Sequence, residues 1–116
     1  MKIIIVGAGE VGYHLAGRLA LENKDVDLID TRGEAIRRVA DSIDVQTIRG
    51  SGSSPVILEQ AGIKEADILL AVTDSDETNL VSCLVADILS PSTQKLARLR
   101  SVDFEAYHQI FKERQP

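Results

Sequence analysis

A short β-branched run that stops at a glycine-rich turn constrains the fold of this chain more than any other feature. Ile3-Ile4-Ile5-Val6 is continuously apolar, and Gly7-Ala8-Gly9-Glu10-Val11-Gly12 follows it directly. Continuous apolar runs are typical of strands covered on both faces, as in a parallel sheet. Apolar residues then recur at helical spacing from Glu10 to Glu22. The glycines are therefore expected between a strand and a helix, the opening unit of a doubly wound α/β fold.

Strands and helices alternate along the remainder of the chain. We expect further strands at 25–30, 44–49, 67–73 and 95–100, and helices that end near Ser42, Gly62 and Leu89, with a last helix from Asp103. Strict alternation implies right-handed crossovers, so the sequence predicts a single Rossmann-like domain over residues 1–116, with strand order 3-2-1-4-5. A complete Rossmann sheet would add a sixth strand, so we expect this chain to be a fragment of a longer protein.

Capping patterns mark where three of the helices begin. They are, in chain order, Thr31 with Glu34, Ser54 with Pro55, and Asp74 with Glu77. The first and third pairs have the spacing of a capping box, in which each side chain bonds the other residue's backbone N–H. In the second pair a serine cap precedes a proline at the first helical position.

Composition excludes several classes of protein. A hydrophobic share of 44% and a charged share of 27% are those of an ordinary globular domain, and the net charge of -5 argues against nucleic acid as a partner. No apolar run approaches the roughly 20 residues of a membrane span, and no signal peptide is recognisable. The single cysteine, Cys83, fits a reducing compartment, so we expect a cytoplasmic protein.

The glycine turn matches G-x-G-x-x-G, with an acid at the expected distance. Gly7 permits a tight turn, Gly9 lets backbone approach a pyrophosphate, and Gly12 allows the helix to pack closely on the strand. Asp30 ends the second expected strand, where a carboxylate can accept hydrogen bonds from ribose hydroxyls. NAD(H) is favoured over NADP(H), although Arg32 could accommodate a 2′-phosphate. The alternative is that the glycines only pack helix on strand and that Asp30 is a solvated strand end.

The ends of all five expected strands carry residues suited to a nucleotide. Ligands of open α/β sheets bind beyond the carboxyl ends of the strands. The end residues here are Gly7, Asp30, Gly50, Thr73 and Arg100. They supply a phosphate loop, an acid, a flexible turn, a hydroxyl and a cation.

Few residues suit proton transfer or nucleophilic catalysis. His14 lies just past the glycine turn, where a surface or packing role is expected, and His108 lies in the last expected helix. Cys83 falls inside an apolar helix and is expected to pack as a small hydrophobe. No metal-ligand cluster or catalytic triad is recognisable. We therefore expect a non-enzymatic domain with no catalytic residues and no metal, the alternative being the cofactor-binding half of an NAD-dependent dehydrogenase.

Three segments resemble a known family. They are residues 1–12, the Gly50-Ser51-Gly52-Ser53 turn, and Ala71-Val72-Thr73-Asp74-Ser75-Asp76-Glu77-Thr78-Asn79-Leu80. Together they resemble the N-terminal nucleotide-binding domains of the TrkA type, also called RCK or KTN domains, over essentially the whole chain. The resemblance implies a cytosolic regulatory domain that binds NAD(H) or ATP/ADP. It further implies dimers or rings on the inner face of the cell membrane, beneath a membrane-embedded Trk potassium transporter.

The resemblance also implies which residues contact the nucleotide. They are Gly7, Ala8, Gly9, Glu10, Val11, Gly12, Asp30, Thr31, Ser51, Thr73, Asp74, Arg98 and Arg100. The glycine turn would hold phosphates, Asp30 the ribose, and Ser51 would lie beside the adenosine. This chain has Ser51 where many relatives have asparagine.

The helix after Asp76 is apolar nearly all round. Its apolar residues are Leu80, Val81, Cys83, Leu84, Val85, Ala86, Ile88 and Leu89. One helix cannot bury all these faces on its own sheet, so we expect a partner surface and a dimer. The alternative is that the last helix covers the remainder through Phe104 and Ile110.

Overall fold

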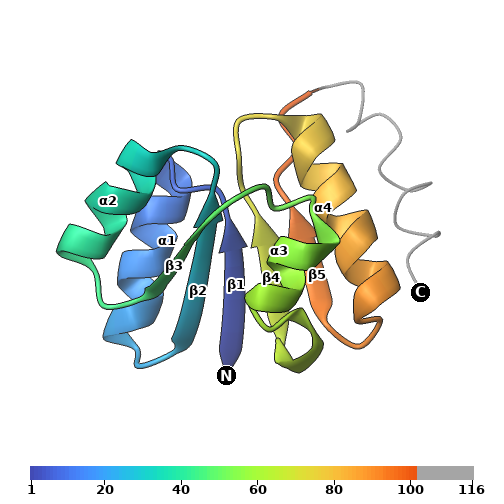
Figure 1. The fold of residues 1–116 in the computed structure, drawn as a ribbon, viewed down its shortest axis with the longest axis horizontal. Helices are drawn as coiled ribbons and strands as arrows, with labels where there is room; N and C mark the ends of the chain where they lie inside the picture. Colours follow the sequence, from blue (N-terminus) through green and yellow to red (C-terminus); the bar gives the residue numbers. More distant parts are fainter. Residues whose placement is uncertain (102–116) are drawn as a thin grey trace.

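The computed structural model describes residues 1–101, which form a parallel sheet between two layers of helices (Figure 1). The strands are β1 (Lys2–Val6), β2 (Asp25–Asp30), β3 (Gln46–Arg49), β4 (Ile68–Ala71) and β5 (Gln94–Ala97). The helices are α1 (Glu10–Leu21), α2 (Gly33–Ser42), α3 (Pro55–Gln60), the 3-10 turn η1 (Ile63–Glu65) and α4 (Asp76–Leu89). The sheet has the order β3-β2-β1-β4-β5, so the predicted fold and strand order are confirmed.

Each face of the sheet has its own core. Ile3 and Ile5 of β1 point to one face, where they pack with Leu28 and with buried residues of α1 and α2. Ile4 and Val6 point to the opposite face, where α3, η1 and α4 lie. Alternate residues of one strand thus serve both layers, which explains why the run from Ile3 to Val6 is continuously apolar.

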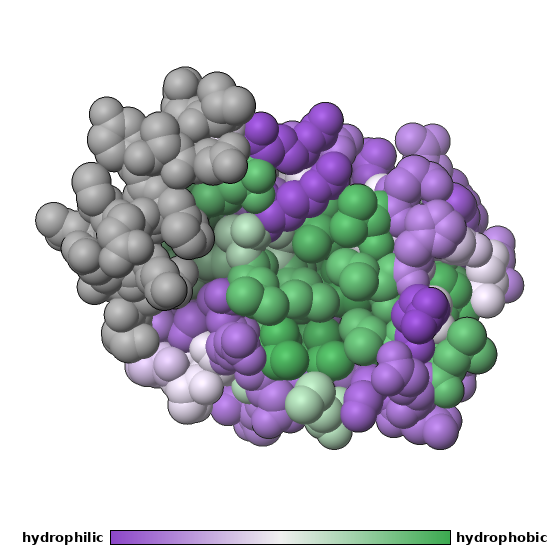
Figure 2. All heavy atoms as spheres, turned by 180° about the vertical axis from the view of Figure 1, so that it is seen from behind, coloured by the Kyte–Doolittle hydropathy of each residue, from purple (hydrophilic) through white to green (hydrophobic). Residues whose placement is uncertain are grey.

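On the side of α1, the sheet is less completely covered at β4 and β5. Ile68, Leu70 and Val72 on this side are only partly buried, and Leu96 of β5 is exposed. Figure 2, which views the molecule from behind, shows a broad apolar area on this side. The helix expected from Asp103 lies outside the described residues. Within residues 1–101, no helix is both long and apolar enough to cross a membrane.

Two of the expected helix caps are wrong. The cap of α2 is Arg32 rather than Thr31, and no side chain caps this helix. The Arg32 N–H donates to the Asp30 carboxylate at 2.8 Å. This bond keeps the backbone extended as far as Arg32, so the helix begins one residue later than expected. The cap of α4 is Ser75 rather than Asp74, since the Ser75 hydroxyl accepts the Thr78 N–H at 3.1 Å.

The other helix boundaries follow the sequence closely. Ser54 caps α3 by accepting the Ile57 N–H at 3.4 Å, and Pro55 begins that helix, as expected. Gly62 follows the end of α3 in the left-handed conformation, with φ at 82°. Three strands are shorter than expected, because β3 begins at Gln46, β4 ends at Ala71 and β5 ends at Ala97. The turns at the strand ends are correspondingly longer.

Candidate nucleotide-binding site

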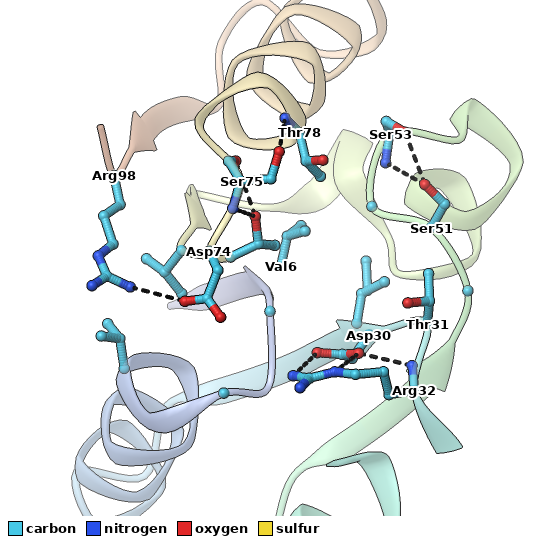
Figure 3. A pocket seen from close by; sticks show the side chains of 18 of the residues that line it. Val6, Asp30, Thr31, Arg32, Ser51, Ser53, Asp74, Ser75, Thr78 and Arg98 are labelled. Atoms are coloured by element: carbon cyan, nitrogen blue, oxygen red, sulfur yellow. Dashed lines mark hydrogen bonds and ion pairs between the residues drawn. The ribbon is translucent and has the colours of Figure 1, made fainter. Parts of the chain in front are cut away.

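An open cavity of about 610 Å³ lies at the carboxyl ends of the strands (Figure 3). Its walls come from the turns that follow β1, β2, β3, β4 and β5. Of the residues predicted from the sequence, it is lined by Gly7, Gly9, Glu10, Val11, Asp30, Thr31, Ser51, Thr73, Asp74, Arg98 and Arg100. Ala8 and Gly12, also predicted, are buried and do not line the cavity. The volume is within the usual range for small-molecule pockets.

The three glycines of the first turn have different surroundings. Gly7 has a φ of 113°, and a Cβ there would lie 3.0 Å from the Thr73 backbone nitrogen. A Cβ on Gly12 would overlap with the carbonyl oxygen of Gly7, so this glycine lets α1 pack against the turn. A Cβ on Gly9 would meet only the Arg32 guanidinium, at 3.8 Å. Gly7 and Gly12 are therefore required by the fold, whereas Gly9 borders open space in the cavity.

Asp30 is almost fully enclosed by hydrogen-bond donors. Its side chain is 7% exposed. One carboxylate oxygen accepts the N–H of Ala8 at 2.7 Å, and the other accepts the N–H of Arg32 at 2.8 Å. The Arg32 guanidinium adds two bonds at 3.1 Å, one to each oxygen. A carboxylate offers about four acceptor positions, so all of them are in use.

These donors also set the ionisation of Asp30. Burial alone would raise the pKa of this carboxyl, but the hydrogen bonds from Arg32 and Ala8 and the charge of Arg32 hold it below its ordinary value. Asp30 is therefore a carboxylate at neutral pH, paired with a cation that is about half exposed. The expectation that Asp30 ends β2 beside the glycine turn is correct, and its direct bond to Ala8 ties the two segments together.

The serine-glycine turn after β3 closes one side of the cavity. The Ser51 and Ser53 hydroxyls are 2.8 Å apart and share a hydrogen bond, and the Ser53 N–H donates to Ser51 at 3.2 Å. A Cβ on Gly52 would overlap with the Val6 side chain, so this glycine lets the turn lie directly on the end of β1. Figure 3 shows Ser51 and Ser53 close to Thr31 on this side.

The turn after β4 is organised around the Thr73 hydroxyl. This hydroxyl donates to Asn79 at 2.7 Å and accepts the Ser75 N–H at 3.2 Å. Ser75 and Thr78 also line the cavity, and neither was expected from the sequence. The signal was present as a serine three residues before a threonine at the start of α4, but Asp74 with Glu77 matched the capping pattern equally well.

Two arginines beyond β5 lie on the side of the cavity opposite to Asp30 and Arg32. Their guanidinium groups lie 3.9 Å (Arg98) and 3.5 Å (Arg100) from the Asp74 carboxylate. Figure 3 shows Arg98 reaching Asp74 across from the Asp30–Arg32 pair. Both arginines were expected inside a strand, but they follow it, because β5 ends at Ala97. Exposed ion pairs of this kind contribute little stability, so these cations can exchange partners readily.

The charges around the cavity are more favourable to an anion than the net charge of the chain suggests. Its lining includes Glu10, Asp30 and Asp74 on one hand and Arg32, Arg98 and Arg100 on the other. The Glu10 carboxylate accepts a hydrogen bond from the Arg38 guanidinium at 2.8 Å, and this bond lowers the pKa of Glu10. The amino end of α1 adds backbone N–H groups that have no acceptor within the helix, together with the positive end of the helix dipole.

His14 and Cys83, two of the residues considered for catalysis, have surroundings that indicate structural roles, and the third, His108, lies outside the described residues. His14 is exposed on α1, 3.5 Å from Glu10. Cys83 packs against the core under α4, and burial raises its pKa to about 11, in agreement with the expected packing role. Among residues 1–101, no three His, Cys, Asp or Glu side chains cluster in a way that could hold a metal ion.

A glycine turn between β1 and α1, an acid at the end of β2 and a cavity at the carboxyl edge of a parallel sheet define a Rossmann-type domain. The family model described as the TrkA-N domain matches residues 3–113, and the chain belongs to this family.

Curated relatives agree with this assignment. The chain is 44% identical over 104 residues to a protein named "Trk system potassium uptake protein TrkA" from Halomonas elongata, covering 90% of this chain and 23% of the relative. It is 42% identical over 106 residues to the protein of the same name from Vibrio alginolyticus, covering 91% and 23%. The chain thus spans about a quarter of the length of these relatives. Their names are those of potassium uptake proteins and not of enzymes, in agreement with the expected non-enzymatic role.

Solved structures support the fold. The TrkA-N domain of the inner membrane protein ybaL from Escherichia coli has a TM-score of 0.81 at 21% identity, covering 94% of this chain and 80% of that one. The AMP-bound form of the Kef CTD from Shewanella denitrificans has a TM-score of 0.82 at 20% identity, covering 99% and 69%. A structure titled "GsuK channel bound to NAD" has a TM-score of 0.81 at 17% identity, covering 94% and 20%.

Proposed function

We propose that this domain binds an adenine nucleotide at the strand ends, either NAD(H) or ATP/ADP, and thereby regulates potassium uptake through a Trk-type membrane transporter. The observation that carries the proposal is the convergence of the glycine turn, Asp30 and two arginines on one cavity. The relatives named as potassium uptake proteins support the transport role. The titles of two fold neighbours, one bound to AMP and one to NAD, support the ligand class.

The residues around the cavity fit such a ligand. The amino end of α1 and the open space over Gly9 would receive phosphates, since helix amino ends bind anions and no side chain blocks the approach. Ser51 and Thr31 would lie beside the adenosine, and Thr73 with Asp74 would border the ligand at β4. Arg98 and Arg100 would neutralise phosphate charge. Glu10 and Val11 would contribute backbone N–H groups, while Ala8 and Gly12 would support the turn from behind.

Ribose binding would require a rearrangement of one ion pair. All acceptor positions of Asp30 are in use, so ribose hydroxyls can bond to it only if the Arg32 guanidinium moves away. Arg32 is able to do so because its side chain is 53% exposed. The same cation would reduce the repulsion between Asp30 and a 2′-phosphate. NAD(H) is still proposed over NADP(H), because Asp30 remains charged and close to the ribose position.

Regulation would follow from assembly of several domains. We propose a cytoplasmic dimer or ring on the inner face of the membrane, peripheral to the transporter. The support comes from α4, where Val81, Leu84 and Ile88 are 45%, 60% and 72% exposed on one side of the helix. A nucleotide can shift such an assembly only if its affinity differs between two arrangements of the domains.

Isothermal titration of the 116-residue chain tests the proposal. NADH, NAD, NADPH, ATP and ADP are titrated into the wild type, Asp30→Ala and Asp27→Ala. Asp27 is the matched control because it is a buried aspartate on the same strand, paired with Lys2 at 2.9 Å and outside the cavity. Thermal unfolding of each variant checks that it is folded.

The expected result is saturable binding of NAD(H) or ATP/ADP that Asp30→Ala weakens and Asp27→Ala does not. Removal of hydrogen bonds between a charged carboxylate and the ribose should cost about 1.5–3 kcal/mol, or roughly 10- to 150-fold in Kd. Absence of binding by every nucleotide would contradict the proposal. Equal losses in both variants would show that the loss at Asp30 is general destabilisation.

A further inference from the structure

Helix α4 buries polar residues and exposes large apolar ones. Asp76, Asn79 and Ser82 are its buried polar residues, and Asn79 and Ser82 have no measurable exposure. On the outer side, Val81, Leu84 and Ile88 are exposed. Burial of polar groups is unfavourable unless each is hydrogen-bonded, so the inner residues must have specific partners.

Asp76 holds the segment that follows β5. One carboxylate oxygen accepts the N–H of Arg100 at 2.9 Å, and the other accepts the N–H of Ser101 at 2.8 Å. Both donors are backbone groups, so Asp76 fixes the path of the chain and leaves the Arg100 side chain free to face the cavity. Hydrogen bonds to an ionised carboxylate are about twice as strong as neutral ones.

Asn79 holds the ends of β4 and β5 together. Its side-chain oxygen accepts the Thr73 N–H at 2.9 Å and the Thr73 hydroxyl at 2.7 Å. Its amide nitrogen donates to the carbonyl oxygens of Thr73 at 3.1 Å and Arg98 at 2.8 Å. One buried side chain therefore satisfies backbone groups on both turns that border this side of the cavity.

Ser82 holds the turn that follows β3. Its hydroxyl donates to the carbonyl oxygen of Gly52 at 2.8 Å, across thirty residues of sequence. This bond draws the serine-glycine turn against α4 while Gly52 lies on Val6 from the other side. Three of the turns that form the cavity are thus attached to the inner side of one helix.

We propose that Asp76, Asn79 and Ser82 are positioning residues of the nucleotide site, an inference that rests on the function proposed above. None of the three lines the cavity, and each bonds to backbone that leads into it. They fix the turns after β3, β4 and β5 in the arrangement that the nucleotide requires. These turns therefore do not have to become ordered when the nucleotide binds. Preorganisation of this kind raises affinity by lowering the entropic cost of binding.

A purely structural role is the competing explanation, and Thr93 provides a matched control for it. Thr93 is also buried, and its hydroxyl donates to the carbonyl oxygen of Ala66 at 2.8 Å and lies 3.1 Å from that of Ile63. Those partners precede β4, at the amino ends of the strands, and do not line the cavity. Thr93→Val should therefore lower the melting temperature as the α4 variants do, without an effect on nucleotide affinity.

The test compares Ser82→Ala, Asp76→Asn and Thr93→Val in the 116-residue chain. ADP and NADH are titrated into each variant, thermal unfolding is recorded, and amide hydrogen exchange of Arg100 is followed by NMR. Ser82→Ala should weaken binding about fivefold, the equivalent of one neutral hydrogen bond. Asp76→Asn should weaken it about tenfold or more and speed exchange of the Arg100 amide, since an asparagine offers a single oxygen to two donors.

The outcomes separate this inference from the proposed function. Wild-type affinity in both α4 variants, or an equal loss in Thr93→Val, would overturn the positioning role while nucleotide binding stands. If the wild type binds no nucleotide, the proposed function fails, and the exchange measurement alone decides whether Asp76 fixes its turn. Unchanged exchange of the Arg100 amide in Asp76→Asn would then overturn the inference.

Discussion

Replacement of Gly9 with alanine separates the two roles that a glycine turn can have, one in packing and one in ligand approach. A Cβ at this position would have the Arg32 guanidinium as its nearest neighbour, at 3.8 Å, which is ordinary van der Waals contact. The φ of Gly9 is -75°, a value that alanine adopts without strain. The added methyl group would instead occupy the space over the amino end of α1, where we propose that phosphates bind.

The two expected magnitudes differ in kind. For stability, alanine reduces the entropy of the unfolded chain, a gain of about 0.4–1 kcal/mol. It is also a poorer helix cap than glycine, a loss of about 1 kcal/mol, so the free energy of unfolding should change by less than about 1 kcal/mol. For binding, a methyl group forced into a filled contact costs about 1–3 kcal/mol, or roughly 5- to 150-fold in Kd.

Gly12→Ala is the control, because its Cβ would overlap with the Gly7 carbonyl oxygen and push α1 off the turn. We expect it to lower the free energy of unfolding by about 3 kcal/mol or more. Chemical denaturation measures stability, and titration with NADH and ADP measures Kd. The reasoning is refuted if Gly9→Ala binds nucleotide as the wild type does, or if it loses as much stability as Gly12→Ala.

Three further predictions concern ionisation, reactivity and assembly. The lowered pKa of Asp30 stabilises the fold above the ordinary value of 3.8, and this contribution is lost as the pH falls through the lowered pKa. Asp30→Asn should therefore have a lower melting temperature than the wild type at pH 7, and its melting temperature should fall less on acidification. Melting temperatures of the variant and the wild type that change in parallel with pH would contradict this. Cys83, with a pKa of about 11 against an ordinary 9.0, should react with a thiol reagent about a hundredfold more slowly at pH 7.5 than the same chain in denaturant. Leu84→Glu should dissociate the proposed dimer in sedimentation equilibrium with little loss of stability, because Leu84 is exposed, and a wild type that is already monomeric at high concentration would overturn that prediction.

The parts of the fold that could be predicted are those in which local sequence and tertiary structure agree. The run from Ile3 to Val6 requires cover on both faces, and the glycine turn requires a helix after it, so the first unit follows from the sequence alone. Asp30 could be identified because its spacing from the glycines is set by the length of one helix and one strand. Gly62 ended α3 because its left-handed conformation suits glycine best.

The helix caps at the site could not be predicted, because tertiary partners chose between equivalent local patterns. Thr31 and Asp74 both match the capping pattern, yet the chain caps α2 at Arg32 and α4 at Ser75. In the first case the Asp30 carboxylate already accepts the Arg32 N–H. In the second the Ser75 N–H is held by the Thr73 hydroxyl, which itself depends on Asn79. These contacts span two to six residues, but their geometry exists only when the strands are paired.

The sequence pattern of α4 predicted the apolar outer side of this helix but not its polar inner side. Its apolar residues indicated more apolar surface than the sheet could cover, and Leu84 and Ile88 are indeed exposed, whereas the residues that α4 buries most completely include Asn79 and Ser82. A helix that served only the core would reverse this arrangement, because each buried polar group contributes little net stability even when it is fully bonded. The arrangement is consistent with a helix whose inner side is committed to the turns around the cavity and whose outer side, through Leu84 and Ile88, is available to a partner. Departures from ordinary burial are expected where binding residues must be held in place, and α4 shows them beside the proposed nucleotide site.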